Sequence, residues 1–308
     1  RSELGLNNGS GLFELTDYEI ATELSYLLWQ TTPNEALLTL AETGQLKDPA
    51  TLFAMTQDML ADPRAAQTIG AMATQWFSLD LLPIVPREGD YADLTSSIRS
   101  AMGMEIDRFV QHAFSEDQLF SDFVTADHSY MNQELATYYG VSWDGSDVDA
   151  DGFAFVDLSD DHRYGGLLTQ GALMTVHALP ISSSPVHRGV LVRERFMCQE
   201  LPPPPANLDT SPPAMDPALS TRERYEQHSS DPACSSCHDL IDSNGFGFEH
   251  YDGIGRYRET DNGHTIDASG SIVSPGDSTL EFDGVAGLSD LLVTNPLTSS
   301  CYVQQWFT

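Results

Sequence analysis

Basic residues are scarce in this chain of 308 residues. It has 14 Lys and Arg against 46 Asp and Glu, which gives a formal net charge of −32, and Lys47 is its only lysine. Such a charge keeps a protein soluble and repels nucleic acid and anionic membranes, so we expect neither as a partner. It is typical of a solvated acidic surface in an extracellular or saline setting. Docking to a basic redox partner is the alternative interpretation.

Long apolar runs and familiar hydrolase motifs are also missing. No stretch approaches the ~18 apolar residues that a membrane helix needs, so we predict no transmembrane segment. The sequence contains no Gly-x-Ser-x-Gly, no His-Glu-x-x-His and no glycine-rich phosphate loop. Paired carboxylates carry little weight in a chain this acidic. Hydrolytic chemistry therefore has little support.

Cysteine is rare, and its four positions fall into two pairs. Cys198 and Cys301 stand far apart in the sequence, and an even pair in an oxidising compartment is most simply a disulfide. Two buried free thiols are the alternative for this pair. Cys234 and Cys237 belong to a compact motif with its own chemistry.

That motif, Cys234-Ser-Ser-Cys237-His238, is a complete attachment site for c-type haem. Two thiols three positions apart can each add to one vinyl group of a haem, and the histidine that follows can reach the iron. Asp231-Pro232 is a helix-start signal, so we expect the motif on a short helix. The sequence thus predicts haem c, with the cysteines as thioethers and His238 as the proximal iron ligand.

The second axial ligand is less clearly marked. His228 lies six residues before the motif, where the chain could fold back over the other face of the ring, and it is the first candidate. His250 and Met174 are weaker candidates, and His177 and His187 also compete. Most single histidines are hydrogen-bonded structural residues, so spacing alone does not decide among them.

Two other uses of the motif cysteines remain open. A zinc site would take both cysteines with His228, and His250 as a further ligand. A disulfide between the two cysteines is the other alternative.

Alternating aspartates form a second candidate site, at Asp147-Val-Asp149-Ala-Asp151-Gly152, with Asp157 downstream. Side chains two apart can converge on calcium while the glycine permits a sharp turn. An EF-hand would need a glutamate where leucine follows Asp157, and flanking helices are not evident. A solvated acidic loop is therefore the alternative to calcium.

Helix-start signals dominate the first 140 residues. Each is a capping side chain near a proline, a glutamate or an apolar helical pattern. They stand at Thr16, Thr32, Asp48, Asp62, Thr95 and Asn132. Gly44 is placed to close the second helix and Gly140 the last.

Later segments alternate between helices and short extended stretches. We predict a strand over 153–158, helices over 165–176, 184–198 and 221–228, and a helical tail over 283–307. Prolines between 202 and 217 indicate an extended connector. The Asn262-Gly263 turn indicates a β-hairpin.

The expected fold class is mainly α. A helical N-terminal domain over 1–140 would be followed by a middle domain with the proline-rich connector over 141–217. A smaller, mostly helical c-type haem domain with a short β-hairpin would occupy 218–308.

Several segments around the haem motif carry a family resemblance. They are Thr16–Trp29, Gly166–Thr175, Ser183–Gly189, Cys198–Pro205, Thr221–His228 and Gly245–Arg258. Together they resemble the planctomycete-type cytochrome c family, whose neighbouring domains of unknown function are DUF1592, DUF1588 and DUF1585. The resemblance assigns these domains in that order to the three predicted parts, and it implies a histidine where His228 stands. Asp242-Ser-Asn-Gly245 departs from the usual Asp-Pro-Ile/Leu-Gly, which loosens one turn.

These observations predict an extracytoplasmic monohaem c-type cytochrome that carries electrons rather than an enzyme. Covalent haem attachment takes place outside the bacterial cytoplasm, so we expect a secreted, cell-surface or periplasmic protein. Its partner would be a redox protein or further copies of itself in an oligomer. Two alternatives remain: a structural subunit of an extracellular complex or filament in which haem is a relay or staple, and a haem enzyme with an open sixth position.

Overall fold

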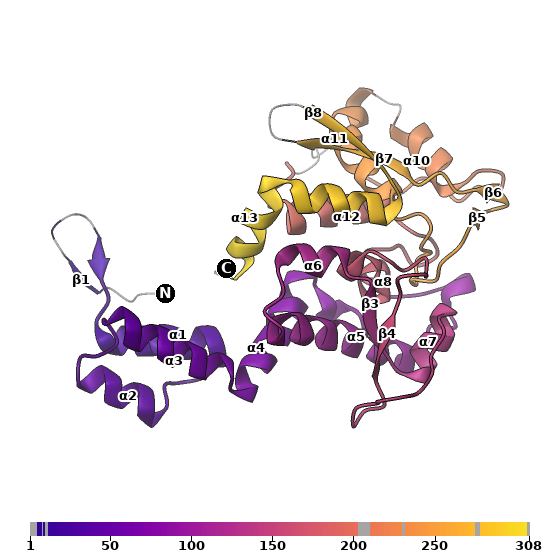
Figure 1. Cartoon of the computed structure of the whole chain (residues 1–308). Coiled ribbons are helices and arrows are strands. Elements are labelled where there is room, and N and C mark those ends of the chain that lie inside the picture. Colours follow the sequence, from indigo (N-terminus) through magenta and orange to yellow (C-terminus); the bar gives the residue numbers. More distant parts are fainter. Residues whose placement is uncertain are drawn as a thin grey trace. The chain divides into compact units, whose positions relative to one another are not determined.

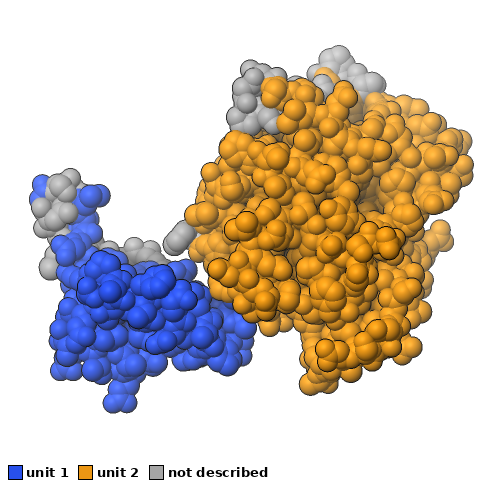
Figure 2. All heavy atoms as spheres, viewed as in Figure 1, with its two compact units in different colours: residues 1–72 blue, residues 73–308 orange. Residues whose placement is uncertain are grey.

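A computed structural model of the chain describes residues 5–7, 9, 12–202, 210–229, 232–274 and 278–306. It is mainly helical, with short antiparallel two-stranded sheets, which confirms the predicted fold class (Figure 1). The chain divides into two compact units, residues 1–72 and 73–308 (Figure 2). The predicted domain boundaries near 140 and 217 stay predictions.

The first unit is a small helical assembly. Its elements are β1 (Leu6–Asn7), β2 (Phe13–Glu14), α1 (Asp17–Trp29), α2 (Glu35–Glu42), α3 (Pro49–Leu60) and the first turns of α4 (Pro63–Trp76). The capping box at Thr16 is confirmed, because its side chain accepts from the backbone of Glu19 and the Glu19 carboxylate accepts from the backbone of Thr16. Asp48 caps α3 as predicted.

The second helix starts two residues later than predicted. Asn34, rather than Thr32, is its N-cap, because the Asn34 side-chain oxygen accepts the N–H of Leu37 at 3.0 Å. An amide side chain next to the helix satisfies an N–H that the earlier threonine would not reach.

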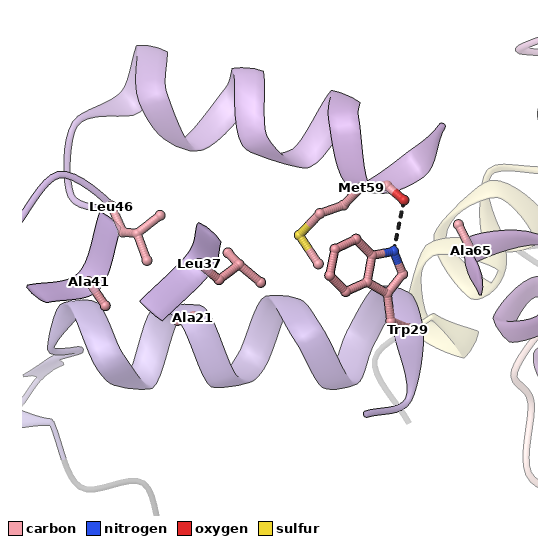
Figure 3. Packing of buried hydrophobic residues seen from close by; sticks show 7 residues of the cluster. All are labelled: Ala21, Trp29, Leu37, Ala41, Leu46, Met59 and Ala65. Atoms are coloured by element: carbon pink, nitrogen blue, oxygen red, sulfur yellow. Dashed lines mark hydrogen bonds between the residues drawn. The ribbon is translucent and has the colours of Figure 1, made fainter. Parts of the chain in front are cut away.

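The first unit has a hydrophobic core of its own (Figure 3). It consists of Ala21, Trp29, Leu37, Ala41, Leu46, Met59 and Ala65. The Trp29 indole N–H donates to the Met59 carbonyl at 3.0 Å, so this buried ring leaves no unpaired donor. The tryptophan and Met59 side chains face each other between α1 and α3 in Figure 3.

The second unit contains the remaining described elements. They are η1 (Leu79–Leu81), η2 (Gly89–Tyr91), α5 (Ser96–Ser115), α6 (Phe120–Thr125), β3 (His128–Met131), α7 (Gln133–Tyr139), β4 (Ala154–Asp157), η3 (Gly166–Thr169), α8 (Gly171–Val176), α9 (Pro185–Leu191), η4 (Val192–Phe196), α10 (Thr221–Ser229), α11 (Pro232–Phe246), β5 (Thr260–Asp261), β6 (His264–Thr265), β7 (Ser269–Ser274), β8 (Ser278–Asp283), α12 (Gly284–Thr294) and α13 (Pro296–Gln305).

Most local signals in this unit are confirmed. Thr95 caps the long helix α5 and Asn132 caps α7. The Asn262-Gly263 turn joins β5 to β6, with positive φ at both residues (51° and 85°), as such a hairpin turn requires. The helical tail is also confirmed, as α12 and α13.

Three expectations need correction. The single helix over 165–176 is two pieces, because Gln170 adopts an extended conformation between η3 and α8. The helix opened by Ser184 changes to π geometry at Val192 and ends at Phe196. A hairpin of β7 and β8, paired from Ser269–Asp283 to Ser274–Ser278, was not expected, because its serine-rich strands lack a strong apolar alternation.

A disulfide joins Cys198 to Cys301, with the sulfur atoms 2.06 Å apart, and this confirms the predicted pair. It ties the residues that follow η4 to helix α13 across a sequence separation of 103.

Helices α9 and α11 lie backbone to backbone, and this contact positions the haem motif. A Cβ atom at Gly189 would lie 2.0 Å from the Ile241 carbonyl oxygen, and one at Gly245 would lie 1.8 Å from that of Pro185. The helices therefore run antiparallel, and both contact points require glycine.

Candidate functional site

Helix α11 carries the predicted haem motif in its first turns. It begins at Pro232, as the Asp-Pro signal predicts, although Asp231 itself lies outside the described residues. The helix is longer than expected, with 15 residues. Positions 234, 237 and 238 are three and four residues apart, so they share one side of the helix. The side chains of Cys234, Cys237 and His228 lie outside the described part of the structure.

The imidazole of His238 is held by a carboxylate one helical turn further along. Its Nδ1 lies 3.0 Å from both carboxylate oxygens of Asp242. Asp242 is 4% exposed and also accepts a hydrogen bond at 2.7 Å from the Ser229 hydroxyl at the end of α10. An ionised carboxylate only accepts, so Nδ1 carries the proton and Nε2 is the nitrogen suited to a metal.

This arrangement fits a covalently held haem. Metal-binding histidines commonly donate their second ring N–H to a carboxylate or carbonyl, which fixes the ring. The His238 side chain is 20% exposed, so the imidazole is largely buried but still reaches the surface. Cys234 and Cys237 would hold the ring edge, and His238 would bind iron.

A buried arginine supports the chain that follows α11. The Arg188 guanidinium on α9 is fully buried and donates to the carbonyl oxygens of Phe248, Tyr251 and Asp252 at 3.0, 2.6 and 2.6 Å. The sequence did not predict this role, because an arginine in an acidic protein is expected to lie on the surface. These bonds attach helix α9 to the chain segment that leaves α11.

A buried network of ion pairs anchors the start of α10. Arg258 bridges the carboxylates of Glu249 and Asp261 at 2.8 and 2.6 Å. Burial raises the pKa of Glu249, while Arg258 acts against that shift. The other oxygen of Asp261 accepts the backbone N–H of Thr221, the first residue of α10. The helix that ends at Ser229 is thereby fixed to the β5–β6 hairpin.

Of the other histidines proposed as second ligands, one has polar and ring contacts, and burial lowers the pKa of the other two. His250 Nδ1 lies 2.9 Å from the Arg258 carbonyl oxygen, and its ring stacks on Tyr257 with centroids 5.3 Å apart. His187 lies on α9, the helix that packs on α11, and burial lowers its pKa. Burial also lowers the pKa of His177, to about 4.

Met174 is fully buried in α8, which packs on α5, η1 and η3, whereas α11 packs chiefly on α9. The choice among these ligands stays a prediction.

Arg108 forms ion pairs with two aspartates of the acidic loop proposed as a calcium site. The Arg108 Nε lies 2.6 Å from the Asp149 Oδ2, and its Nη2 lies 2.6 Å from the Asp151 Oδ2. The other oxygen of Asp149 accepts two backbone N–H groups of its own loop. Asp157 lies in strand β4, opposite His128. No group of three or more metal-binding side chains occurs among the described residues. Calcium therefore has no support from these contacts, and the arginine explains how the loop is held.

No helix in the described part of the chain combines the length and apolar character needed to cross a membrane.

Two family models match the sequence, and together they cover most of it. PSD4, described as a protein of unknown function (DUF1592), matches residues 15–141. PSCyt3, described as a protein of unknown function (DUF1588), matches residues 164–261, a range that includes the Cys-Ser-Ser-Cys-His motif and Asp242. No curated protein and no solved structure matches the chain.

Proposed function

Because this chain belongs to the planctomycete-type cytochrome c family, we propose that it is an extracytoplasmic monohaem c-type cytochrome that transfers electrons. Cys234 and Cys237 would form the thioethers, His238 would be the proximal ligand and His228 the second axial ligand. When bound, the haem supplies a one-electron iron couple whose potential the protein tunes.

The observation that carries this proposal is the contact of His238 with Asp242 on the helix that bears both cysteines. The contact orients the imidazole and assigns the proton to Nδ1, which is what an iron ligand requires. The Cys198–Cys301 disulfide supports an oxidising location, since such bonds persist outside the cytoplasm. The formal charge of −32 supports a basic redox partner.

The test is the visible spectrum of protein produced in cells that mature c-type cytochromes in the periplasm. We expect a Soret band that stays with the polypeptide after acid extraction, and a six-coordinate low-spin spectrum in both oxidation states. The double variant Cys234→Ser, Cys237→Ser should lose covalent haem. The matched variant Cys198→Ser, Cys301→Ser removes the other cysteine pair and should keep it.

Three outcomes would contradict the proposal. Zinc without iron in metal analysis would identify a zinc site. High-spin iron that binds CO readily would indicate a haem enzyme with an open sixth position. Covalent haem retained by the Cys234→Ser, Cys237→Ser variant would exclude the assigned attachment site.

The second ligand has its own test within the same experiment. His228→Ala should convert the spectrum from low-spin to high-spin, because the sixth position loses its ligand. His250→Ala and Met174→Leu should leave it low-spin. A low-spin spectrum in His228→Ala would transfer the assignment to whichever of the other variants becomes high-spin.

A further inference from the structure

The carboxylate beside His238 is unusually well placed to act on the ring electronically. Both Asp242 oxygens lie 3.0 Å from Nδ1, and the side chain is buried, so water does not weaken the interaction. A hydrogen bond to an ionised acceptor is roughly twice as strong as one to a neutral acceptor. The ring N–H of His238 is therefore strongly polarised toward Asp242.

We propose that Asp242 is a positioning residue that lowers the reduction potential of the haem by making His238 a more electron-donating ligand, and that Ser229 limits this effect. The proposal rests on the proposed function, because it requires His238 to bind the iron. Partial negative charge on the imidazole stabilises Fe(III) more than Fe(II), since the oxidised iron carries the extra positive charge. The proton stays on the Nδ1–Asp242 hydrogen bond throughout.

Ser229 affects how strongly Asp242 accepts the hydrogen bond from His238. Its hydroxyl oxygen lies 2.7 Å from the Asp242 Oδ2 and 2.7 Å from the Tyr225 carbonyl oxygen, so its single proton is shared between these two acceptors and draws part of the charge away from the carboxylate. It is the last residue of α10, which Asp261 anchors at the other end through the N–H of Thr221. The position of α10 therefore sets how strongly Asp242 can polarise His238.

The test is the haem midpoint potential, measured by spectroelectrochemical titration of the holoprotein. Asp242→Asn keeps a polar side chain of the same shape and removes the charge. We expect the ratio of reduced to oxidised haem at a fixed ambient potential to rise about tenfold, which takes as its scale the lower end of the effects that such partners have on metal affinity or activity. For a one-electron couple this corresponds to a rise of about 59 mV. Asp242→Glu keeps the negative charge, so its midpoint potential should lie between those of Asp242→Asn and the parent.

The opposite sign is expected for Ser229→Ala. Removal of the hydroxyl leaves Asp242 a stronger acceptor, so the potential should fall. This variant changes no charge. It also keeps the inference testable if Asp242→Asn does not acquire covalent haem. An unchanged potential in Ser229→Ala together with an unchanged or immature Asp242→Asn overturns the inference.

A matched control separates this contact from the general loss of a buried negative charge. Glu105→Gln removes a buried carboxylate on α5 that accepts hydrogen bonds from the Ser129 and Tyr139 hydroxyls instead of from His238. Its potential should stay close to that of the parent. A rise equal to that of Asp242→Asn would overturn the inference.

Failure of this inference is distinguishable from failure of the proposed function. If the parent protein binds no covalent haem, the proposed function fails before any potential is measured. If haem is attached and low-spin in every variant but the potentials do not move as stated, only the role of Asp242 is wrong.

Discussion

His177 shows how strongly burial acts on a single side chain in this protein. Its imidazole lies at the end of α8, and its pKa is lowered to about 4, first by burial and then by the nearby His187, Arg188 and Arg195. Its Nε2 has no hydrogen-bond partner among the described residues. The folded protein therefore keeps this ring neutral at pH values where an exposed histidine would be charged.

A stability change with pH follows from this shift. Above pH 6.5 the ring is neutral in both states and contributes nothing. As the pH falls from 6.5 to about 4, the unfolded chain binds a proton that the folded protein does not, so the free energy of unfolding decreases by about 3 kcal/mol in total. His177→Gln should remove this part of the pH dependence in urea denaturation at pH 7, 5.5 and 4.5.

The exposed His162 provides the matched control, because His162→Gln also removes one imidazole. It should retain the decrease between pH 6.5 and 4. A His177→Gln variant with the same pH dependence as the parent would show that the buried imidazole does not cause it.

Residues of the site differ in how readily the sequence reveals them. Asp242 stands four positions after His238, a spacing that places both on one side of a helix, so its role could have been predicted. Ser229 could not, because only the packing of α10 on α11 brings it to the carboxylate.

At the scale of elements, the contact of α9 with α11 holds the haem motif. Glycine at 189 and at 245 removes the side chain at two points, which lets the helix backbones touch. The Arg193 guanidinium continues the contact, with its Nε donating to the Leu240 carbonyl at 2.9 Å. The helix that carries the cysteines is thereby fixed by backbone groups.

Gly189→Ala should destabilise the protein by about 3 kcal/mol, the upper end for an overpacked site, because the new methyl group collides with a backbone carbonyl that cannot move freely. Gly103→Ala is the matched control on helix α5, where a Cβ would meet only a side-chain atom of Leu82 at 3.9 Å. It should stabilise by about 0.5–1 kcal/mol, through the higher helix propensity of alanine. Urea denaturation measures both, and equal effects would refute the close contact.

At the scale of the whole molecule, the interior holds charged groups of both signs. Arg163, Arg188, Arg193 and Arg224 are buried, which removes cations from the surface of a chain that has only 14. Several of these guanidinium groups donate to backbone carbonyls instead of carboxylates. Five carboxylates among the described residues are buried as well, those of Glu105, Asp242, Glu249, Asp252 and Asp261. Burial therefore removes nearly equal numbers of positive and negative groups, and the surface keeps the strongly acidic charge of the chain.

The disulfide acts on this scale too, because it closes a loop with a sequence separation of 103. Its loss should lower the free energy of unfolding by about 2–5 kcal/mol, mainly because the unfolded chain gains freedom. Thermal unfolding of the Cys198→Ser, Cys301→Ser variant should show this, and reductant should have the same effect on the parent. Reductant should leave the variant unchanged. A parent whose transition is insensitive to reductant would contradict the prediction.

The sequence by itself determined the features whose physics is local. Helix caps at Thr16, Asp48 and Thr95, the Asn-Gly turn and the haem motif each depend on residues a few positions apart. The pairing of Cys198 with Cys301 was predictable because only one such pair remained.

Only the tertiary structure decided what depends on distant neighbours. The break at Gln170, the β7–β8 hairpin and the burial of Arg188 arise because packing and long-range hydrogen bonds outweigh local preference. The same is true of the site: the motif places His238 on a helix, but the fold brings Ser229 and Asp242 together behind its ring. Burial makes that contact strong, and burial is a property of the folded chain.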